Sequence, residues 1–366
     1  MLIVENCDPG NSPFRRTSCP CPICAAPSAG PCYRGYPGYV EGTCYDIYRC
    51  QQCDARFIAS MEIEPALYEF IYAARCLAGY DRYVDYGTRV LYERDPLRFL
   101  ALQEGAYHVL ARHLAQKSNL RILDVGCGYG YLTHAMRSRG FEAFGIDISA
   151  QALTIARQRY GDYFFHADVQ SFGWPAAQRF DLIVAIEVIE HLADPVACVR
   201  SLLGLLTPSG SVLITTPNSD FCSPTAVWRT ELPPVHTVWL GSKSGAALAG
   251  SVGCDYRIEL QADFYPHHEN KLAKYLGYRK APRPAPRMAS DGTVAAQHQD
   301  SFYRVRGAAN RLLHECGPVR AVCNLIHNRM LRVDETLAMF LWKRGQNPFP
   351  SSVPEAKAGH GEGAKH

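Results

Sequence analysis

The stretch Arg121-Ile-Leu-Asp-Val-Gly-Cys-Gly-Tyr-Gly130 decides the fold of this chain. A short apolar run ends at Val125, three glycines follow at alternate positions, and a helical pattern comes next. Glycines remove side chains, so a ligand can approach the backbone N–H groups at a helix N-terminus. The stretch therefore predicts a strand, a tight turn and a helix that bind a nucleotide-type ligand. A dinucleotide fingerprint requires glycine where Tyr131 stands, which disfavours hydride chemistry.

A second motif lies at Phe144-Gly-Ile-Asp-Ile-Ser149, where an apolar strand ends in Asp147. An acid at the end of this strand is placed to accept hydrogen bonds from two ribose hydroxyls. Two further segments, Ala167-Asp168 and Phe180-Asp-Leu-Ile-Val-Ala185, follow in order. A glycine turn with solvated acids at strand ends is the simpler interpretation of any one of these motifs, but it does not explain why all four occur in order.

Together these motifs resemble the S-adenosylmethionine-dependent class I methyltransferases over roughly residues 119–220. The resemblance implies an α/β fold: a Rossmann-like, seven-stranded, mostly parallel sheet with helices on both faces. It also implies that the glycines pack under the methionine and ribose of the cofactor and that Asp124 helps to hold its amino group. Asp147 would take the ribose hydroxyls, Asp168 and Val169 would lie at the adenine, and Glu187 would border the methyl-donor pocket. The implied cofactor-binding residues are Asp124, Gly126, Gly128, Gly130, Asp147, Asp168, Val169 and Glu187.

The rest of the core alternates strands and helices, which predicts a parallel sheet covered on both faces. Ser149 and Asp194 are expected to cap two of the helices. The expected helices are 150–160, 195–206 and 242–250, and the expected strands are 180–185, 210–216, 256–260 and 337–342.

Composition is that of a soluble enzyme large enough to bury a full core. The chain has 366 residues, of which 47% are hydrophobic and 20% charged, with a net charge of +3. This balance argues against a strong polyanion-binding surface. The N-terminal sequence lacks the features of a signal peptide, and no apolar run is long enough to span a membrane. We therefore expect a cytoplasmic protein.

Fifteen cysteines include two Cys-x-x-Cys knuckles, Cys21-Pro-Ile-Cys24 and Cys50-Gln-Gln-Cys53. Their separation leaves room for a small β-hairpin, so the four thiolates predict a closed, structural Zn²⁺ site of the ribbon type in residues 1–60. So small a module would obtain much of its folding free energy from the metal. Cys19 is a spare candidate ligand, and a redox role of the knuckles is the alternative.

Four segments complete the expected domain organisation. Residues 61–118 form a helical linker or cap, whose Tyr83 and Tyr86 are packing residues or line an acceptor pocket. Residues 119–344 form the methyltransferase core, interrupted by a lid-like insertion at 261–336 with helices near 268–278 and 302–332. A decorative insertion or a dimer face is the alternative role of that insertion, and the oligomeric state is left open. Residues 345–366 are rich in glycine and proline and predict a disordered tail.

Glu187-Val-Ile-Glu-His191 places two carboxylates and an imidazole at spacings that share one face of a helical turn. The segment resembles a motif of ubiquinone-pathway O-methyltransferases and of small-RNA 3′-end 2′-O-methyltransferases. That resemblance implies a divalent metal held by Glu187, Glu190 and His191, with a conceivable fourth ligand near His236. The alternatives are a general-base role of His191 or His236 beside Glu190, or simple packing. Histidine suits proton removal from a hydroxyl near neutral pH, which favours O-methylation.

The whole layout resembles bacterial methyltransferases of undetermined substrate that are often assumed to act on sugars or other small metabolites. We therefore predict methylation of a small-molecule or saccharide-type acceptor. Metal-assisted 2′-O-methylation of RNA is the enzymatic alternative, although the chain lacks a basic stripe, so nucleic acid is an improbable partner. A non-catalytic cofactor-binding scaffold whose zinc ribbon recruits partners is the second class of hypothesis.

Overall fold

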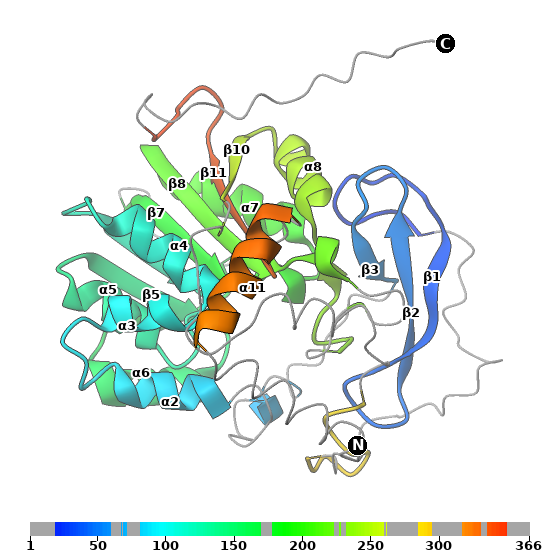
Figure 1. The fold of residues 1–366 in the computed structure, drawn as a ribbon, viewed down its shortest axis with the longest axis horizontal. Coiled ribbons are helices and arrows are strands. Elements are labelled where there is room, and N and C mark those ends of the chain that lie inside the picture. The colour runs from blue at the N-terminus through cyan, green and yellow to red at the C-terminus, as the bar shows by residue number, and fades with distance from the viewer. Residues whose placement is uncertain are drawn as a thin grey trace.

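The computed structural model describes residues 19–59, 67, 69–71, 81–169, 178–222, 227, 232–259, 261, 285–294, 317–330 and 335–349. A central sheet with helices on both faces fills most of the molecule, and a smaller N-terminal sheet lies beside it (Figure 1). Within the described part, no helix combines the length and the apolar character needed to cross a membrane.

The central sheet has seven strands in the order β10-β11-β8-β7-β4-β5-β6. Neighbouring strands from β8 to β6 are parallel, whereas β11 is antiparallel to both of its neighbours. This arrangement confirms the predicted seven-stranded, mostly parallel sheet. The strands are β4 (Arg121–Val125), β5 (Glu142–Asp147), β6 (Phe164–His166), β7 (Phe180–Ile186), β8 (Leu206–Pro217), β10 (Asp255–Glu259) and β11 (Thr336–Trp342).

Two hydrophobic clusters cover the two faces of this sheet. Residues of α2 to α6 form one cluster with the sheet, and residues of α7 and α8 form the other. Buried positions alternate between the clusters along each strand, as the period of two in a strand requires. The helices are α2 (Asp81–Arg89), α3 (Pro96–Gln103), α4 (Gly105–Leu114), α5 (Tyr131–Ser138), α6 (Ala150–Tyr160), α7 (Pro195–Gly204) and α8 (Ser242–Val252).

Capping side chains set the helix starts where the sequence predicted them. The Ser149 hydroxyl accepts from the N–H of Ala152, and the Asp194 carboxylate accepts from that of Ala197. Such caps satisfy backbone donors that have no partner within the helix. Helix α7 ends at Gly204 and strand β8 already begins at Leu206, so the expected helix was slightly too long and the expected strand too short.

The N-terminal sheet has the order β1-β2-β3-β9, and its last strand comes from the core rather than from residues 1–60. All of its strand pairs are antiparallel. The sequence predicted the hairpin but not the fourth strand, because two residues are too few to give a recognisable pattern. The strands are β1 (Ser28–Pro37), β2 (Cys44–Cys50), β3 (Arg56–Ile58) and β9 (Val238–Trp239).

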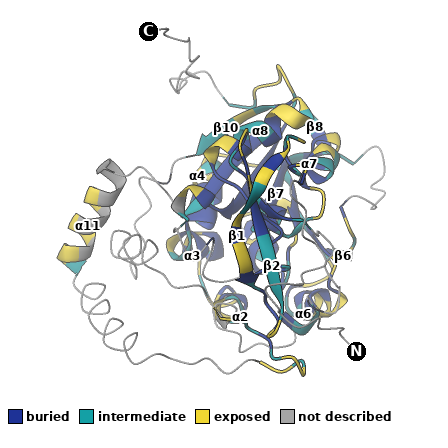
Figure 2. Cartoon of the chain, turned by 90° about the vertical axis from the view of Figure 1, so that its right-hand side faces the viewer, coloured by how far each residue is buried: buried dark blue, intermediate teal, exposed yellow. Residues whose placement is uncertain are grey.

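The insertion is described in two pieces. Helix α11 (Gly317–Met330) lies within the predicted helix 302–332 and stands apart from the core, with exposed side chains (Figure 2). Residues 285–294 reach the ribbon, where the N–H groups of Arg287 and Met288 donate to the carbonyl of Tyr39. The predicted helix at 268–278 lies outside the described residues, and a lid role for the insertion remains a prediction.

The start of the predicted disordered tail differs from the expectation. Phe349 packs against Phe340 and Trp342, with ring centroids 5.2 and 5.3 Å apart, and the guanidinium of Arg257 lies 3.6 Å from its centroid. The Phe349 side chain thus attaches residues 345–349 to the sheet by burying apolar area against it. A glycine- and proline-rich composition does not reveal such a contact.

Candidate functional site

The glycine loop after β4 has the backbone that only glycine adopts at low cost. Gly126, Gly128 and Gly130 have φ values of +69°, +49° and +77°. A Cβ on Gly126 would lie 2.5 Å from Val188, and one on Gly130 would lie 2.6 Å from the ring of Phe164. The loop is therefore packed closely against Val188 and Phe164, and a side chain at Gly126 or Gly130 would collide with them. Its predicted role under the cofactor stays a prediction.

Asp147 ends β5 and holds the loop in place. Its carboxylate accepts from the N–H of Gly128 and from the N–H of Ser149, each at 2.8 Å. The side chain is buried, and burial raises the pKa of the carboxyl while these backbone donors oppose the shift. Asp147 thus lies beside the glycines, at the place predicted for the ribose acceptor.

Asp124 lies on β4 behind the same loop. The hydroxyl of Thr133 donates to its carboxylate at 2.7 Å. Burial, with a further contribution from the charge of Asp147, raises the pKa of Asp124 to about 7. Two acids that share a dry environment favour a cationic ligand, because a positive charge lowers the cost of ionising both. The sulfonium and amino groups of S-adenosylmethionine supply such charge.

Asp168 and Val169 follow β6, the edge strand next to β5. The Asp168 side chain is exposed, whereas Val169 is buried in the cluster that contains α7. An apolar floor beside an exposed acid fits a heterocycle with polar edges, and the predicted place of both residues at an adenine stays a prediction.

Glu187 follows β7 with φ at +53°, a left-handed conformation that is strained for a residue other than glycine. The hydroxyl of Thr215 donates to its carboxylate at 3.1 Å. Burial, with a contribution from the charge of Glu104, raises the pKa of Glu187 to about 7. Its neighbour Val188 contacts the position of Gly126, and the predicted place of Glu187 at the methyl-donor pocket stays a prediction.

Tyrosines of the linker gather on the same side. The Arg82 guanidinium and the Tyr86 hydroxyl both donate to the carboxylate of Glu104, at 2.8 and 3.0 Å. Tyr83 stacks on Tyr131, the residue that follows the glycine loop, with centroids 6.4 Å apart. The linker tyrosines therefore lie next to the cofactor loop, which fits either a packing role or an acceptor wall.

Glu190, His191 and His236 come together in a group whose ligand atoms all lie within 4.8 Å of one another. Glu190 and His191 belong to the 3-10 helix η1 (Ile189–His191), and His236 comes from the segment before β9. Glu187 lies outside this group of three, although its side chain is hydrogen-bonded to that of Glu190. The group thus joins Glu190 and His191 of the predicted set to His236, the conceivable fourth ligand, and metal binding there stays a prediction.

Hydrogen bonding fixes the tautomer of His191. Its Nδ1 lies 2.8 Å from the carbonyl of Val235, which can only accept, so Nδ1 carries the proton and Nε2 carries the lone pair. Burial lowers the pKa of His191 to about 4, and burial also lowers the pKa of His236 well below its usual range. Both rings are neutral at neutral pH, the state that accepts a proton or binds a metal.

The depressed pKa of His191 predicts a pH-dependent contribution to stability. Its folded pKa of about 4 lies below the ordinary histidine pKa of 6.5, so below pH 6.5 the unfolded state binds the extra proton and is favoured. We expect the wild-type protein to lose stability relative to His191→Asn, by roughly 1 kcal/mol per pH unit, as the pH falls from 6.5 to about 4. Asparagine retains a donor for Val235 without titrating. Urea unfolding of both proteins at several pH values measures this difference, and a constant difference would contradict it.

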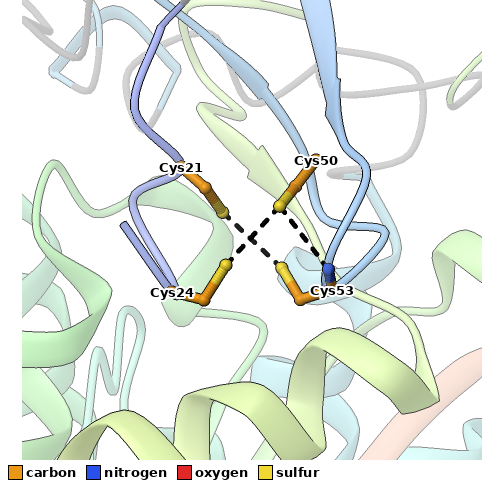
Figure 3. Close-up of side chains that lie close together, drawn as sticks. All are labelled: Cys21, Cys24, Cys50 and Cys53. Atoms are coloured by element: carbon orange, nitrogen blue, oxygen red, sulfur yellow. Dashed lines mark hydrogen bonds between the residues drawn. The ribbon is translucent and has the colours of Figure 1, made fainter. Parts of the chain in front are cut away.

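The four knuckle cysteines converge, as Figure 3 shows. Cys21 Sγ lies 3.6 Å from Cys53 Sγ, and Cys24 Sγ lies 3.5 Å from Cys50 Sγ, so the close pairs join the two knuckles rather than the ends of one. Zn–S bonds of about 2.3 Å in a tetrahedron place sulfurs about 3.8 Å apart, close to these separations. Backbone N–H groups of Ile23 and Cys53 also point at the sulfurs, at 3.4 and 3.5 Å. Cys19 is outside this group within the described residues.

Several residues of the site escaped the sequence reasoning. Thr133 and Thr215 bind the acids Asp124 and Glu187, and Glu104 contributes the charge that raises the pKa of Glu187. A threonine next to an apolar strand carries no recognisable signal, because strands use threonine freely. Glu104 lies outside the sequence motifs. The packing of α3 on α5 brings it near Glu187.

Comparisons with known proteins agree with this geometry. The family model described as "Methyltransferase domain" matches residues 97–280, half of the chain. A ubiquinone biosynthesis O-methyltransferase of Aromatoleum aromaticum is 34% identical over 136 residues, which cover 36% of this chain and 54% of that protein. The same enzyme of Stutzerimonas stutzeri is 31% identical over 135 residues, with 36% and 54% covered. The chain thus spans about half the length of these curated relatives.

Solved structures resemble this chain more loosely. A SAM-dependent methyltransferase from Archaeoglobus fulgidus aligns with a TM-score of 0.37 and 15% identity, covering 64% of this chain and 94% of that one. A magnesium protoporphyrin IX methyltransferase from Synechocystis with bound SAM aligns with a TM-score of 0.37 and 17% identity, covering 55% and 92%. Similarities of this size carry no argument about function.

Proposed function

Because the chain belongs to the methyltransferase-domain family, we propose that it transfers the methyl group of S-adenosylmethionine to an oxygen of a small-molecule or saccharide-type acceptor. The single observation that carries the cofactor is the left-handed glycine loop beside two buried acids, Asp124 and Asp147. The relatives named above act in ubiquinone biosynthesis, which favours a small-molecule acceptor over RNA. Family membership likewise favours an enzyme over a non-catalytic scaffold.

The residues of this chain bind and orient, while the bound cofactor supplies an activated methyl group on a sulfonium. Asp147 is the expected acceptor for the ribose hydroxyls, and Asp124 stabilises positive charge behind the loop. Glu187 is held at the loop by its strained backbone and by Thr215. Alignment of the acceptor oxygen with the sulfonium contributes most to the rate, because positioning converts a bimolecular step into a unimolecular one.

Proton removal from the acceptor hydroxyl is assigned to the neutral histidines. A histidine nitrogen would take the proton of the acceptor hydroxyl. The bound cofactor would supply the methyl group, whose bond to sulfur breaks as the bond to oxygen forms, and sulfur would leave as a neutral thioether. His191 is oriented for this role by its bond to Val235, and the Glu190 carboxylate, 4.0 Å from His236 Nε2, stabilises an imidazolium there. Because the pKa of His191 is low, its ring is a weak base, and its contribution should be moderate.

Substitution of His191 by Asn is expected to lower turnover about a hundredfold and to leave cofactor affinity within about threefold. Asparagine keeps the donor to Val235 but lacks the nitrogen that accepts the proton. Labelled S-adenosylmethionine, incubated with a cell extract that is then separated into RNA, protein and small-molecule fractions, identifies the acceptor class and provides the assay. His134→Asn on α5, outside the group, is the matched control. Equal turnover of His191→Asn and wild type would contradict the assignment.

The His236→Ala variant tests the second histidine. A fall below about a thousandth of wild-type turnover, with intact cofactor binding, would show that His236 is an obligatory base.

A divalent metal is the second candidate at the same group. One carboxylate and two imidazoles, all within 4.8 Å of one another, form a suitable donor set, and the bond from Nδ1–H of His191 to the carbonyl of Val235 orients its ring. Glu190, His191 and His236 would hold the ion, which would gather acceptor oxygens and acidify a hydroxyl. Loss of activity on dialysis against a chelator of Mg²⁺ and Mn²⁺, restored by either ion, distinguishes this role from a base acting alone.

The four knuckle cysteines are proposed to bind structural Zn²⁺. Their separations match a tetrahedral tetrathiolate site, and backbone N–H groups are placed to stabilise thiolates. One zinc per chain by elemental analysis, lost in Cys50→Ser and retained in Cys32→Ser, is the expected result. Cys32 belongs to the same ribbon but is exposed and lies outside the group.

A further inference from the structure

We propose that the zinc ribbon positions Glu190 and His236 and is therefore a part of the methyl-transfer site rather than a separate recruitment module. The inference rests on the proposed function of that site and deepens it. It follows from a continuous path of backbone hydrogen bonds that leads from the second cysteine knuckle to the buried acid and histidine.

The first step of this path lies within the ribbon. The chain turns tightly at Cys50 and Cys53. The N–H of Cys50 donates to the carbonyl of Ala55 at 2.9 Å, and the N–H of Asp54 donates to the carbonyl of Cys50 at 3.0 Å. Strand β3 begins at Arg56, directly after this turn. The metal site therefore sets where β3 starts and how its backbone is oriented.

The second step crosses from the ribbon to the core. Strand β3 pairs with β9, with Arg56 opposite Trp239 and Phe57 opposite Val238. The N–H of Ile58 donates to the carbonyl of Thr237 at 3.0 Å. Within the described residues, β3 is the strand that pairs with β9, so the ribbon supplies the ladder that keeps this short strand extended.

The third step reaches the catalytic group. The N–H of Thr237 donates to the carbonyl of Glu190 at 2.8 Å, and its hydroxyl lies 3.1 Å from that carbonyl and 2.9 Å from the carbonyl of Leu192. His236 stands between Thr237 and Val235, the residue whose carbonyl orients His191. Thr237 is thus bonded to the ribbon by its carbonyl and to η1 by its N–H and hydroxyl.

Packing makes the ribbon and the core one unit. Cysteines of the knuckles, Phe57 and Val238 belong to the same hydrophobic cluster as α7 and α8. Two polar contacts add to it, from the Arg56 guanidinium to the carbonyl of Ser219 at 3.1 Å and from the Ser251 hydroxyl to the carbonyl of Ile23 at 2.7 Å. A module built only to recruit partners would not need so large a buried contact with the site's own scaffold.

Metal binding then becomes coupled to the geometry of the site. A small tetracysteine module obtains much of its folding free energy from zinc, so removal of the ion should release β3. Release of β3 leaves β9 without its ladder. The segment that carries His236 then loses the support of the ribbon and is held by its bonds to the core, from Thr237 to Glu190 and from Ser219 to Leu240. The glycine loop and Asp147 lie on β4 and β5, which have their own pairing partners, and should keep their structure.

Hydrogen exchange of the full chain, with zinc bound and after its removal by EDTA, tests this coupling without any methyl-transfer assay. We expect amides of residues 235–240 to exchange at least about tenfold faster without zinc and to regain their protection when Zn²⁺ is added. Amides of residues 121–126 should keep their protection throughout. Unchanged protection at 235–240 would overturn the proposal. Loss of protection in both segments would also overturn the proposal, because the ribbon would then support the whole fold. A protein that binds no zinc would overturn it as well.

A pair of variants tests the link itself in zinc-loaded protein. Thr237→Val removes the hydroxyl contacts to Glu190 and Leu192, whereas Thr237→Ser retains the hydroxyl. We expect the kcat of Thr237→Val to be about tenfold below that of wild type, with an unchanged KM for S-adenosylmethionine and an unchanged zinc content. Thr237→Ser should have the kcat of wild type. Equal kcat in Val and Ser variants would contradict the positioning role. Failure of the proposed function can be told apart from failure of this inference. It would appear as a lack of S-adenosylmethionine binding, while the effect of zinc on hydrogen exchange would be as expected.

Discussion

Asp147→Ala is expected to bind S-adenosylmethionine at least about a hundredfold more weakly than the wild-type protein, or about 3 kcal/mol, in a calorimetric titration. The carboxylate is the predicted acceptor for two ribose hydroxyls, and hydrogen bonds to a charged group contribute about 1.5–3 kcal/mol each. The same oxygens accept from Gly128 and Ser149, so their loss also loosens the loop that receives the cofactor. Both effects act in the same direction on affinity.

Asp162→Ala is the matched control for this titration, because its side chain is 96% exposed on the same domain. It should bind the cofactor within about threefold of wild type. Affinity in Asp147→Ala equal to that of the control would show that this acid does not contact the cofactor. Absence of binding in all three proteins would overturn the proposed function itself.

Gly130→Ala is expected to lower the free energy of unfolding by about 3 kcal/mol. A φ of +77° costs an L side chain about 1–2 kcal/mol, and overpacking a dense interior costs about 1–3 kcal/mol. The new Cβ would lie 2.6 Å from the Phe164 ring and 2.8 Å from Ala156. Phe164 is buried and Ala156 belongs to α6, so neither can move away cheaply.

Gly140→Ala separates the two causes. Gly140 has φ at +88°, but a Cβ there would meet nothing within 4 Å. Its substitution should therefore cost only the conformational strain, about 1 kcal/mol. Urea denaturation of both variants measures the difference, and equal destabilisation would show that the loop is not close-packed against α6.

The core of the fold could be predicted from the sequence because its signals are local. Glycines that require left-handed backbone, acids at strand ends, and Ser149 or Asp194 before a helix each carry their meaning within a few residues. Alternation of such segments then allows few topologies, since parallel strands require helical crossovers. The two Cys-x-x-Cys knuckles are equally local, and their convergence followed from spacing and zinc chemistry.

The group of Glu190, His191 and His236 was only partly predictable. The sequence placed Glu187 with Glu190 and His191 on one helical turn, whereas Glu187 has a left-handed backbone and η1 begins only at Ile189. His236 joins the group from a segment more than forty residues away. A strained φ arises from the fit of a turn between packed strands, and sequence spacing alone does not reveal it.

By itself, then, the sequence predicted the glycine loop, the mostly parallel seven-stranded sheet and the convergence of the two cysteine knuckles, because each rests on short-range backbone chemistry. Only the tertiary structure decided that β9 completes the ribbon sheet, that Thr237 links this sheet to Glu190, and that His236 joins His191. Contacts of this kind join residues far apart in the chain, and a two-residue strand or a single threonine has no periodicity that announces its partner.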